Sequence, residues 1–539
     1  QASSHLPESA GNPVIAPQSS LMGEIIVMGA TSDTLSPMEL RTNMEWNVRP
    51  RLLAVGGVAQ IVLIGGDYKE YQILANPLKM KHFNVSADEL AAACESANRN
   101  IPGGFFSQHG NRYVVRGLSR TYDTLQIGQT LIKMQDEQPV KVKDVASVTV
   151  SGAPRIGAGS IDGKSGVVMT ITKQPGINTI KLSEKIHETL DNIENNAKSD
   201  IRFHKQVFNQ AEFISRSVNN VKTALIEGAA LVVIILFLFL MNARTTIISV
   251  IALPLSLLTG VITLYLLDIT INTMTLGGMT IAIGSLVDDA IIDVENVYKR
   301  LRERSRDKNV NYLKVVYDAS IEIRSSILNA TLIIIVAFLP LFFLSGMEGR
   351  MLQPLGIAYI VALAASLIIA MTVTPVLCSL LLTNKKSLAV NPSGSWVERN
   401  LKRVYRSGLH SALQSKRVVI VSAFVLLAGA GVLLSSFGND FLPPLREGAL
   451  TINVSTIPGT SLKESEKLGR RAENIMLGMP EISTVTRRTG RAELAEHTFG
   501  VNVSELDAPY TLQDRSREAF LADLREQLHH IPGANIEVG

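Results

Sequence analysis

The sequence predicts an α+β multidomain membrane protein, in which a bundle of transmembrane helices is combined with soluble modules of the split βαβ type. Three observations lead to this fold class. The chain of 539 residues is 46% hydrophobic, and its mean hydropathy of +0.21 is too high for an ordinary soluble protein. Six stretches are apolar and long enough to cross a bilayer. The segments on either side of them alternate strand and helix patterns.

Charge and cysteine content add little to this assignment of the protein class. The net charge of +4 is small for this length, so nothing indicates a nucleic-acid partner. Cys94 lies in a polar segment and Cys378 in an apolar one, so we expect no disulfide between them. The chain opens at Gln1 without a methionine or a signal peptide, and we interpret it as an internal piece of a longer protein.

Residues 1–218 are predicted to form soluble modules, the first partial and the second complete. Hydrophobic patterns and turn residues there give a strand, a helix, two strands, a helix and a strand, which is the order of the split βαβ sandwich. The two middle strands are expected to form a hairpin about Gly65 and Gly66, and the second helix to be capped at Ser86. The six elements are predicted at 23–29, 36–55, 58–66, 68–74, 86–98 and 111–117.

Residues 219–384 are predicted to hold five spans, and a sixth follows at 418–437. A single apolar stretch of this length could be a buried core helix, but six of them favour a membrane bundle. Three prolines lie inside the predicted spans, at Pro254, Pro340 and Pro375, where neighbouring helices can compensate for them. The six stretches are 225–241, 246–267, 273–297, 325–345, 353–382 and 418–436.

Basic residues predict the orientation of the bundle. The loops after the third and fifth spans are rich in Lys and Arg, so both are predicted to be cytoplasmic. The turns 267–273 and 345–351 carry at most one basic residue and are placed outside. Because six crossings return the chain to its starting side, residues 1–218 and 438–539 are both expected outside the cytoplasm.

The connector 385–417 contains an amphipathic pattern. Apolar residues recur at helical spacing between residues 396 and 413, with basic residues opposite them. We expect a helix that lies in the cytoplasmic membrane interface, and a surface helix packed on the bundle fits the pattern equally well.

Residues 438–539 are predicted to form a partial third soluble module. A strand at 450–456, a helix at 461–477, a strand at 485–490 and a helix at 516–531 repeat part of the N-terminal order. This repetition indicates internal duplication of one kind of module.

The third span carries the most informative residues, because acids at bilayer depth cost roughly 2.5 to 3.5 kcal/mol each on insertion scales and are usually functional. Asp288 and Glu295 share one helix face, and Asp289, Asp293 and Asn296 share another, about 100° away. We interpret Asp288 and Asp289 as a proton relay, with a purely structural role as the alternative.

The other acids of this span and its glycines complete the prediction. Glu295 precedes Lys299 and is expected at the solvated end of the helix. Asp293 could lie either at that end or at depth with the relay acids. The glycines at 277, 278 and 284 would let another helix approach closely. The other five spans carry no Lys or Arg at depth, so the relay's counter-charge is expected outside this piece.

These motifs identify a family resemblance that covers essentially the whole chain. The stretch "LGGMTIAIGSLVDDAIIDVENVYKRL" resembles the fourth transmembrane helix of the resistance-nodulation-division (RND) exporters. The stretches "GMEGRMLQPL", "FLPPLREGALTINVSTIPGTS" and "RTGRAE" are similar to the heavy-metal efflux branch, which includes copper/silver and cobalt/zinc/cadmium exporters.

The resemblance implies ferredoxin-like porter modules in the periplasm and a multi-pass permease in the bacterial inner membrane. It implies a piece that runs from the first porter module, through the second to seventh transmembrane helices, into the third. It also implies a homotrimer that works with a periplasmic adaptor protein and an outer-membrane channel, without a bound cofactor and driven by proton influx. The family's relay aspartate corresponds to Asp288, and Asp289 matches a second acid of many drug exporters. The family's relay partners on its tenth and eleventh helices correspond to positions beyond Gly539.

The cargo is where the sequence departs from the copper and silver exporters. Asn453, Leu286 and Asp293 stand where those exporters have methionines, and of the corresponding thioethers only Met274 remains. Zinc, cobalt or nickel would require His and carboxylate ligands, which Glu493, Glu496 and His497 could supply. An ordinary polar loop explains those three residues as well.

Two other functions remain open. An exporter of organic drugs or detergents would keep the same proton relay, although an aromatic content of 5% favours it less. A lipid- or sterol-sensing protein with the same helix bundle would leave the acids structural. No nucleophile elbow, phosphate-binding loop or HExxH motif occurs, so no enzyme is predicted.

Overall fold

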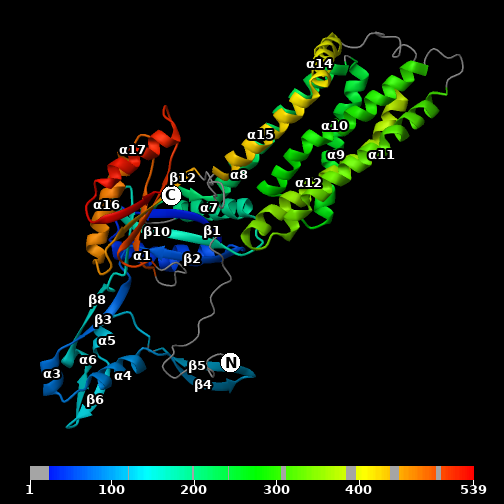
Figure 1. Ribbon diagram of the computed structural model, residues 1–539. Coiled ribbons are helices and arrows are strands. Elements are labelled where there is room, and N and C mark those ends of the chain that lie inside the picture. The colour runs from blue at the N-terminus through cyan, green and yellow to red at the C-terminus, as the bar shows by residue number, and fades with distance from the viewer. Residues whose placement is uncertain are drawn as a thin grey trace. The chain divides into compact units, whose positions relative to one another are not determined.

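The computed structural model describes residues 23–118, 120–196, 200–240, 242–304, 311–383, 396–436, 448–492 and 499–538. The chain forms two compact units. The first unit comprises residues 1–213 and 445–539 and holds the strands, and the second comprises residues 214–444 and holds the long helices (Figure 1).

The first module of the strand-containing unit is a four-stranded antiparallel sheet. Helices connect its first strand to its second and its third strand to its fourth. Its strand order is β11-β1-β10-β2. A continuous helical run connects β1 to β2, begins at a capping box formed by Ser36 and Glu39, and contains a π-helical turn. The elements are β1 (Glu24–Thr31), α1 (Pro37–Asn43), η3 (Met44–Val48), α2 (Arg49–Leu53), β2 (Val58–Ile64), β10 (Lys164–Lys173), α7 (Thr179–Asn196) and β11 (Arg202–Asn209).

The core of this module lies between the sheet and its helices. The inward residues of β1, β2 and β10 are apolar and almost fully buried, and Leu182, Ile186 and Leu190 of α7 cover them. This spacing of four residues places one apolar stripe of α7 on the sheet, which is the pattern of an amphipathic helix.

The predicted hairpin about Gly65 and Gly66 is wrong. β3 (Lys69–Ala75) pairs with β8 (Ala146–Gly152), whereas β2 pairs with β10. Gly65 and Gly66 have φ angles of +94° and +68° and turn the chain out of the sheet instead. A Cβ atom on Gly65 would lie 2.4 Å from the Gly166 carbonyl oxygen, so this turn requires glycine.

The segment that follows β2 is an insert that separates the second strand of the module from the third. The predicted helix capped at Ser86 and the predicted strand 111–117 both exist, but they belong to this insert and not to the module. The insert contains β3, α3 (Pro77–His82), α4 (Ala87–Ala97), β4 (Ile101–Gln108), β5 (Asn111–Gly117), α5 (Thr124–Gly128), β6 (Leu131–Gln135), β7 (Gln138–Lys141), α6 (Val142–Val145) and β8.

The second module has the same element order and the same strand order as the first. Its sheet runs β13-β14-β12-β15, again antiparallel between neighbours. The sequence pattern predicts four of its six elements and also a strand just before Gly539, which is β15, so β14 was missed. The elements are β12 (Ala449–Thr456), α16 (Leu462–Leu477), β13 (Thr486–Gly490), β14 (Val503–Pro509), α17 (Arg517–His529) and β15 (Ala534–Val538).

The two modules share one sheet. β9 (Gly157–Ile161) forms a hairpin with β10, and on its other edge it pairs with β13 of the second module. Within the described residues this pairing produces a continuous nine-stranded sheet. Segments more than 300 residues apart in the sequence therefore lie side by side.

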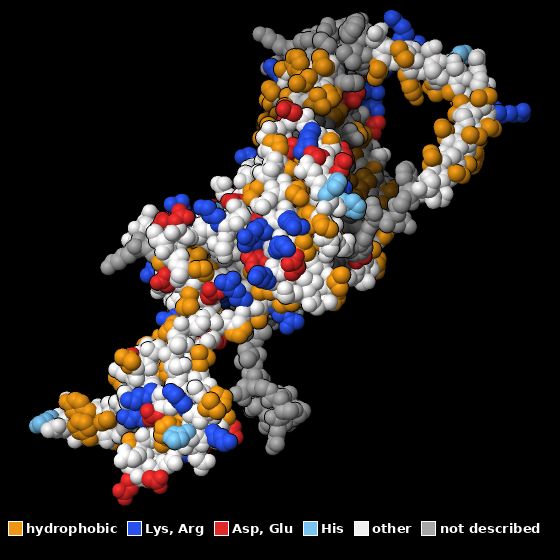
Figure 2. Space-filling view, turned by 90° about the vertical axis from the view of Figure 1, so that its left-hand side faces the viewer, with side chains coloured by type: hydrophobic (Ala, Val, Ile, Leu, Met, Phe, Trp, Pro, Cys, Tyr) orange, Lys and Arg blue, Asp and Glu red, His pale blue; other side chains and the backbone are white. Residues whose placement is uncertain are grey.

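Six helices among the described residues are long and apolar enough to cross a membrane, one for each predicted span. α9, α10, α11 and α12 pack together, while no described residue in the apolar windows of α8 and α15 is buried. Figure 2 shows apolar side chains over much of the helical surface, as expected for helices that contact lipid. The helices are α8 (Gln210–Leu240), α9 (Ala243–Leu266), α10 (Thr273–Arg304), α11 (Tyr312–Phe338), α12 (Gly346–Leu381), α14 (Trp396–Gln414) and α15 (Lys416–Ser436).

Two details of the helices bear on the prediction. Pro340 lies inside the fourth candidate span as predicted, in a 3-10 turn, η4 (Leu339–Phe343), that follows the end of α11 at Phe338. α14 is amphipathic as predicted, and its apolar residues Leu401, Val404 and Leu413 are all exposed. No described part of the protein covers this apolar stripe, and both predicted positions of the helix stay predictions.

Candidate functional site

The acids of the third predicted span lie in α10, the helix that contacts α9, α11 and α12. The structure describes the backbone at Asp288 and Asp289 as helical, and their side chains lie outside what it describes. It brings Asp293 into the helix interface, because this side chain is only 3% exposed. Within the described part of the chain Asp293 Oδ2 has no hydrogen-bond partner.

Asp293 faces α11 and α12. It lines a cavity together with Ser320 and Arg324 of α11 and Met371 and Pro375 of α12. A carboxyl group buried among membrane helices is a strong indication of function, since such a position is costly for a group that only fills space.

The end of α10 is anchored to α11 by polar contacts. Asn296 Nδ2 donates a hydrogen bond to the Ala319 carbonyl oxygen at 2.9 Å. Arg300 Nη2 forms an ion pair of 2.5 Å with Glu322 Oε1. Glu295 is exposed, as expected for an acid at the end of the span. Among the acids of α10 whose side chains the structure describes, Asp293 is therefore buried and Glu295 is exposed.

Only one of the three glycines predicted to allow close helix packing does so within the described structure. A Cβ atom on Gly278 would lie 2.3 Å from the Leu355 carbonyl oxygen, so α10 and α12 approach closely there. A Cβ atom on Gly277 or Gly284 would have no neighbour within 4 Å among the described residues. About two turns beyond Gly278 on α10, Ser285 Oγ lies 3.4 Å from the hydroxyl of Tyr359 on α12.

The predicted metal ligands do not form a site in the described structure. Met274 is half-buried at the start of α10. Glu493, Glu496 and His497 lie outside the described residues. Among the described residues no group of three or more His, Cys, Asp or Glu side chains is arranged to hold a metal ion.

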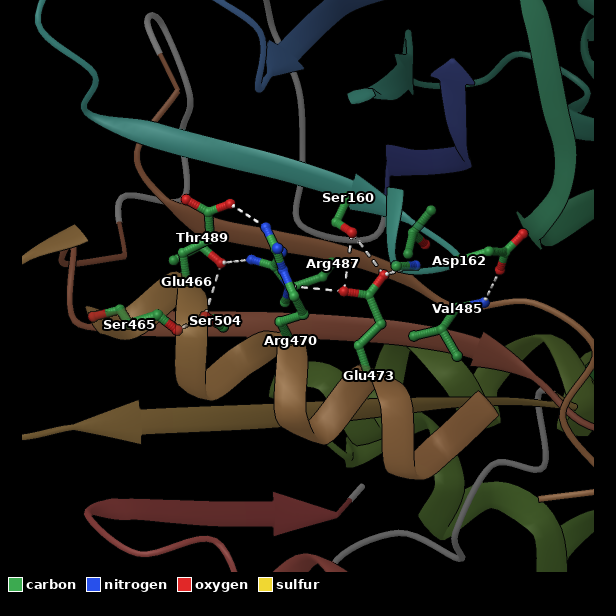
Figure 3. Close-up of polar contacts among 12 residues, drawn as sticks. Ser160, Asp162, Ser465, Glu466, Arg470, Glu473, Val485, Arg487, Thr489 and Ser504 are labelled. Atoms are coloured by element: carbon green, nitrogen blue, oxygen red, sulfur yellow. Dashed lines mark hydrogen bonds and ion pairs between the residues drawn. The ribbon is translucent and has the colours of Figure 1, made fainter. Parts of the chain in front are cut away.

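A buried ion pair in the strand-containing unit was not predicted from the sequence. Glu473 of α16 and Arg487 of β13 are both 0% exposed, and Arg487 Nε lies 3.1 Å from Glu473 Oε2. Glu473 Oε1 also accepts hydrogen bonds of 2.7 Å from Ser160 Oγ and from the Gly163 amide (Figure 3). Because Ser160 and Gly163 belong to the β9–β10 hairpin, this carboxylate joins the two modules.

Backbone contacts at the tip of the same hairpin add to this connection. Asp162 Oδ1 accepts a hydrogen bond of 2.8 Å from the Val485 amide, and the Asp162 amide donates one of 2.9 Å to the Val485 carbonyl oxygen. Gly469 of α16 lies over the buried guanidinium, where a Cβ atom would come within 2.7 Å of Arg487 Cδ. The sequence did carry a signal for the pair, because Glu473 lies on the same helical stripe as Leu468, Ala472 and Met476.

A second polar cluster lies on strands β13 and β14. Arg488 Nη2 forms ion pairs with Asp507 Oδ2 at 2.8 Å and Glu505 Oε2 at 3.0 Å. Burial, with the nearby negative charges of Asp507 and Glu24, raises the pKa of Glu505 to about 7 even though Arg488 acts in the opposite direction. Asn453 of β12 is directly opposite Glu505, and its buried Oδ1 has no hydrogen-bond partner among the described residues.

Comparison with known proteins agrees with the family resemblance and with the fold. The model of the AcrB/AcrD/AcrF family matches residues 1–539. The chain is 28% identical to the cobalt-zinc-cadmium resistance protein CzcA of Cupriavidus metallidurans, over 100% of this chain and 52% of that protein. It is 31% identical to the nickel-cobalt-cadmium resistance protein NccA of Alcaligenes xylosoxydans xylosoxydans, over 86% of this chain and 43% of that protein.

A copper-type relative and a solved structure extend the comparison. The cation efflux system protein CusA of Escherichia coli is 27% identical over 90% of this chain and 47% of its own length. The crystal structure of a heavy metal efflux pump superposes with a TM-score of 0.83 at 24% identity, covering 99% of this chain and 51% of that one.

The chain thus spans about half the length of the curated relatives it matches. The family model matches the whole chain, and the relatives that resemble it are named for resistance to or efflux of metals. The protein therefore belongs to the AcrB/AcrD/AcrF family of RND efflux transporters, within the heavy-metal efflux branch.

Proposed function

We propose that the full-length protein is a proton-driven permease of the bacterial inner membrane that exports metal cations. The observation that carries this proposal is α10, a membrane-length helix packed against three others that contains Asp288, Asp289 and Asp293. Proton uptake and release by carboxyl groups in such a helix can drive a conformational cycle, because each step changes the charge inside the bundle. The proton gradient is then the energy source, and no bound cofactor is needed.

We also propose that the pump works as a homotrimer with a periplasmic adaptor protein and an outer-membrane channel. In support, the hairpin of β4 and β5 exposes several large apolar side chains that nothing in the described chain covers. Apolar patches of this kind usually mark contact surfaces. They include Phe105, Phe106, Tyr113 and Val114.

The soluble modules are assigned the ferredoxin-like fold of porter modules. Both have the order β-α-β-β-α-β with the fourth strand beside the first and the third beside the second, which is the arrangement of the split βαβ sandwich. The unit formed by the two modules would lie in the periplasm, as the distribution of basic residues predicts.

The cargo we favour is a divalent metal such as zinc, cobalt or nickel. Asn453 and Asp293 replace thioether side chains of the copper exporters, and the polar cluster near Asn453 supplies oxygen atoms from Glu505 and Asp507. Carboxylate and amide oxygens suit harder cations than Cu(I).

The test of the proposed function is Asp288→Asn in the full-length protein. An amide keeps the size of the carboxyl group but cannot carry the proton, so we expect resistance to the exported metal to fall to the level of cells without the pump while the protein remains in the membrane. Asp318→Asn changes an exposed acid on α11 and serves as the matched control.

The resistance assay compares zinc, cobalt, nickel, copper, silver and an organic dye, so it identifies the cargo as well. Unchanged export by Asp288→Asn would refute the relay. Protection against the dye alone would refute the metal assignment in favour of a drug exporter.

A further inference from the structure

The cavity beside Asp293 is lined by residues of α10, α11 and α12 and has a volume of about 20 Å³. A cavity of roughly 10 to 15 Å³ or more holds one water molecule when polar groups line it. The apolar side chains of Ile327 and Leu367 also line the cavity. A water molecule there could therefore form hydrogen bonds only with the few polar atoms of the lining.

Two buried oxygen atoms at this cavity have no partner within the described structure. They are Asp293 Oδ2 and Ser320 Oγ, in residues that are 3% and 9% exposed. An unpaired buried polar atom is unfavourable and rare in native proteins, and an ordered water molecule is its usual partner. Asp293 belongs to α10 and Ser320 to α11, so the two atoms border the cavity from neighbouring helices and can share one partner.

A third oxygen is made available by Pro375. Proline has no N–H group, so the carbonyl oxygen of Met371, four residues earlier in α12, lacks its normal helical hydrogen bond. Met371 and Pro375 both line the cavity. Broken helical hydrogen bonds of this kind supply oxygen ligands for ions and water inside membrane transporters.

Charged and titratable groups lie near this carboxyl group on both neighbouring helices. Arg324 of α11 lines the cavity, and the buried thiol of Cys378 on α12 lies near Asp293. A carboxyl group at a hydrated cavity can exchange a proton with the water that it contacts.

We propose that this cavity is a hydrated proton-binding site, in which one water molecule held by Ser320 and the Met371 carbonyl exchanges a proton with Asp293. In the uptake step a hydronium ion gives its proton to the carboxylate and leaves neutral water and the acid, and release is the reverse. The site is separate from Asp288, because five residues along a helix turn the side chain by about 140°. Its contribution to export rests on the proposed function, whereas the site itself does not.

The first experiment is an infrared titration of the full-length protein in nanodiscs. We expect Asp293→Asn to remove one protonated-carboxyl band from the wild-type difference spectrum and Ser320→Ala to shift that band without removing it. Asp318→Asn should leave it unchanged. An Asp293→Asn spectrum identical to that of the wild type would overturn the proposal, and so would a band that depends on sodium at constant pH, because the occupant would then be a metal cation.

The second experiment detects the water molecule by radiolytic hydroxyl-radical footprinting. Radicals formed from bound water oxidise the nearest side chains, so Met371 should be oxidised rapidly in the wild type and several-fold more slowly in Asp293→Leu. Met279, buried in an apolar cluster of the same bundle, is the internal control and should stay unmodified. Equal oxidation of Met371 in Asp293→Leu and the wild type would show that no such water is held.

The two experiments do not depend on transport. If Asp288→Asn leaves export unchanged, the proposed function fails while the infrared band and the footprint still decide the site. If Asp288→Asn abolishes export but the wild-type spectrum lacks the Asp293 band, the proposed proton-binding site is refuted and the proposed export function is supported.

Discussion

Glu473 shows how a single buried charge can connect two parts of a chain. Its carboxylate pairs with Arg487 of its own module and accepts hydrogen bonds from the hairpin of the other. Removal of one partner from a buried pair is costly because the other charge is left without compensation, whereas replacement of both by apolar residues is often neutral.

We therefore predict that Glu473→Ala lowers the stability of the strand-containing unit by about 3 to 5 kcal/mol. Hydrogen exchange of the β9 and β13 amides in the full-length protein measures this directly. The double variant Glu473→Leu with Arg487→Met should recover most of the loss. Glu466→Ala, which breaks the exposed pair with Arg470, is the matched control and should cost about 0 to 1 kcal/mol. A similar effect of the two single variants would contradict a bridging role for Glu473.

Glu505 should make the unit sensitive to pH. Its pKa in the folded protein is about 7, above the ordinary value of 4.5, so the folded state binds this proton more tightly than the unfolded state. Stability from this group is present below about pH 4.5 and is lost as the pH rises towards 7.

We predict that the melting temperature of the full-length protein falls between pH 5 and pH 8 and that Glu505→Gln reduces this fall. Differential scanning fluorimetry at several pH values provides the measurement. Glu537→Gln, at an acid on β15 that is also in register with Asn453, is the control and should keep the wild-type slope. If the melting temperature of Glu505→Gln falls with pH as steeply as that of the wild type, Glu505 does not titrate in this range.

At the scale of the elements, the contact between α10 and α12 depends on Gly278. A methyl group there would overlap the Leu355 carbonyl oxygen, which is backbone and cannot rotate away. We predict that Gly278→Ala costs about 1 to 3 kcal/mol, as overpacking usually does. Gly284→Ala, on the same helix but with nothing within 4 Å in the described structure, should be nearly neutral.

Thermal unfolding of the helical unit in detergent, followed by circular dichroism, compares the two glycine variants. Equal stability of both would mean that α10 and α12 do not touch at Gly278 in the native protein.

The elements also show which features the sequence could predict. The six membrane-length helices and the Ser86 cap follow from local composition, and the structure contains them. The hairpin about Gly65 was wrong because the partner of a strand is chosen by distant residues, here β8 and β10. β14 was missed because Glu505 and Asp507 made it resemble a loop, and only their pairing with Arg488 explains acids in a strand.

The candidate site was predictable to a similar extent. The acids of α10 stand out because an apolar helix should not contain them, and the exposed position of Glu295 agrees with the prediction. The orientation of Asp293 towards Ser320 and Pro375 could not be predicted, because it depends on which helices pack against that face. The bridging role of Glu473 was missed because, although Arg487 is only 14 residues away, the hydrogen bond from Ser160 comes from 313 residues away in the first module.

For the molecule as a whole, the distribution of basic residues predicts which loops face the cytoplasm. We predict that Thr270→Cys, in a variant with Cys94→Ala and Cys378→Ala, reacts with a membrane-impermeant maleimide in intact cells. Lys299→Cys in the same background should react only after the membrane is permeabilised. Both positions are exposed in the structure, so access to solvent does not bias the comparison. Labelling of Lys299→Cys in intact cells would reverse the proposed orientation.

The pairing of β9 with β13 also determines when the protein can finish folding. During synthesis β9 is made before all six membrane helices, and Glu473, which anchors its hairpin, follows Ser160 by 313 residues. At roughly 5 to 20 residues per second, the ribosome needs about 15 to 60 s to make this stretch. For that interval β9 is an open strand edge, the kind of surface at which newly made chains pair wrongly with one another. A helper that shields this edge during membrane insertion would therefore raise the yield of folded protein.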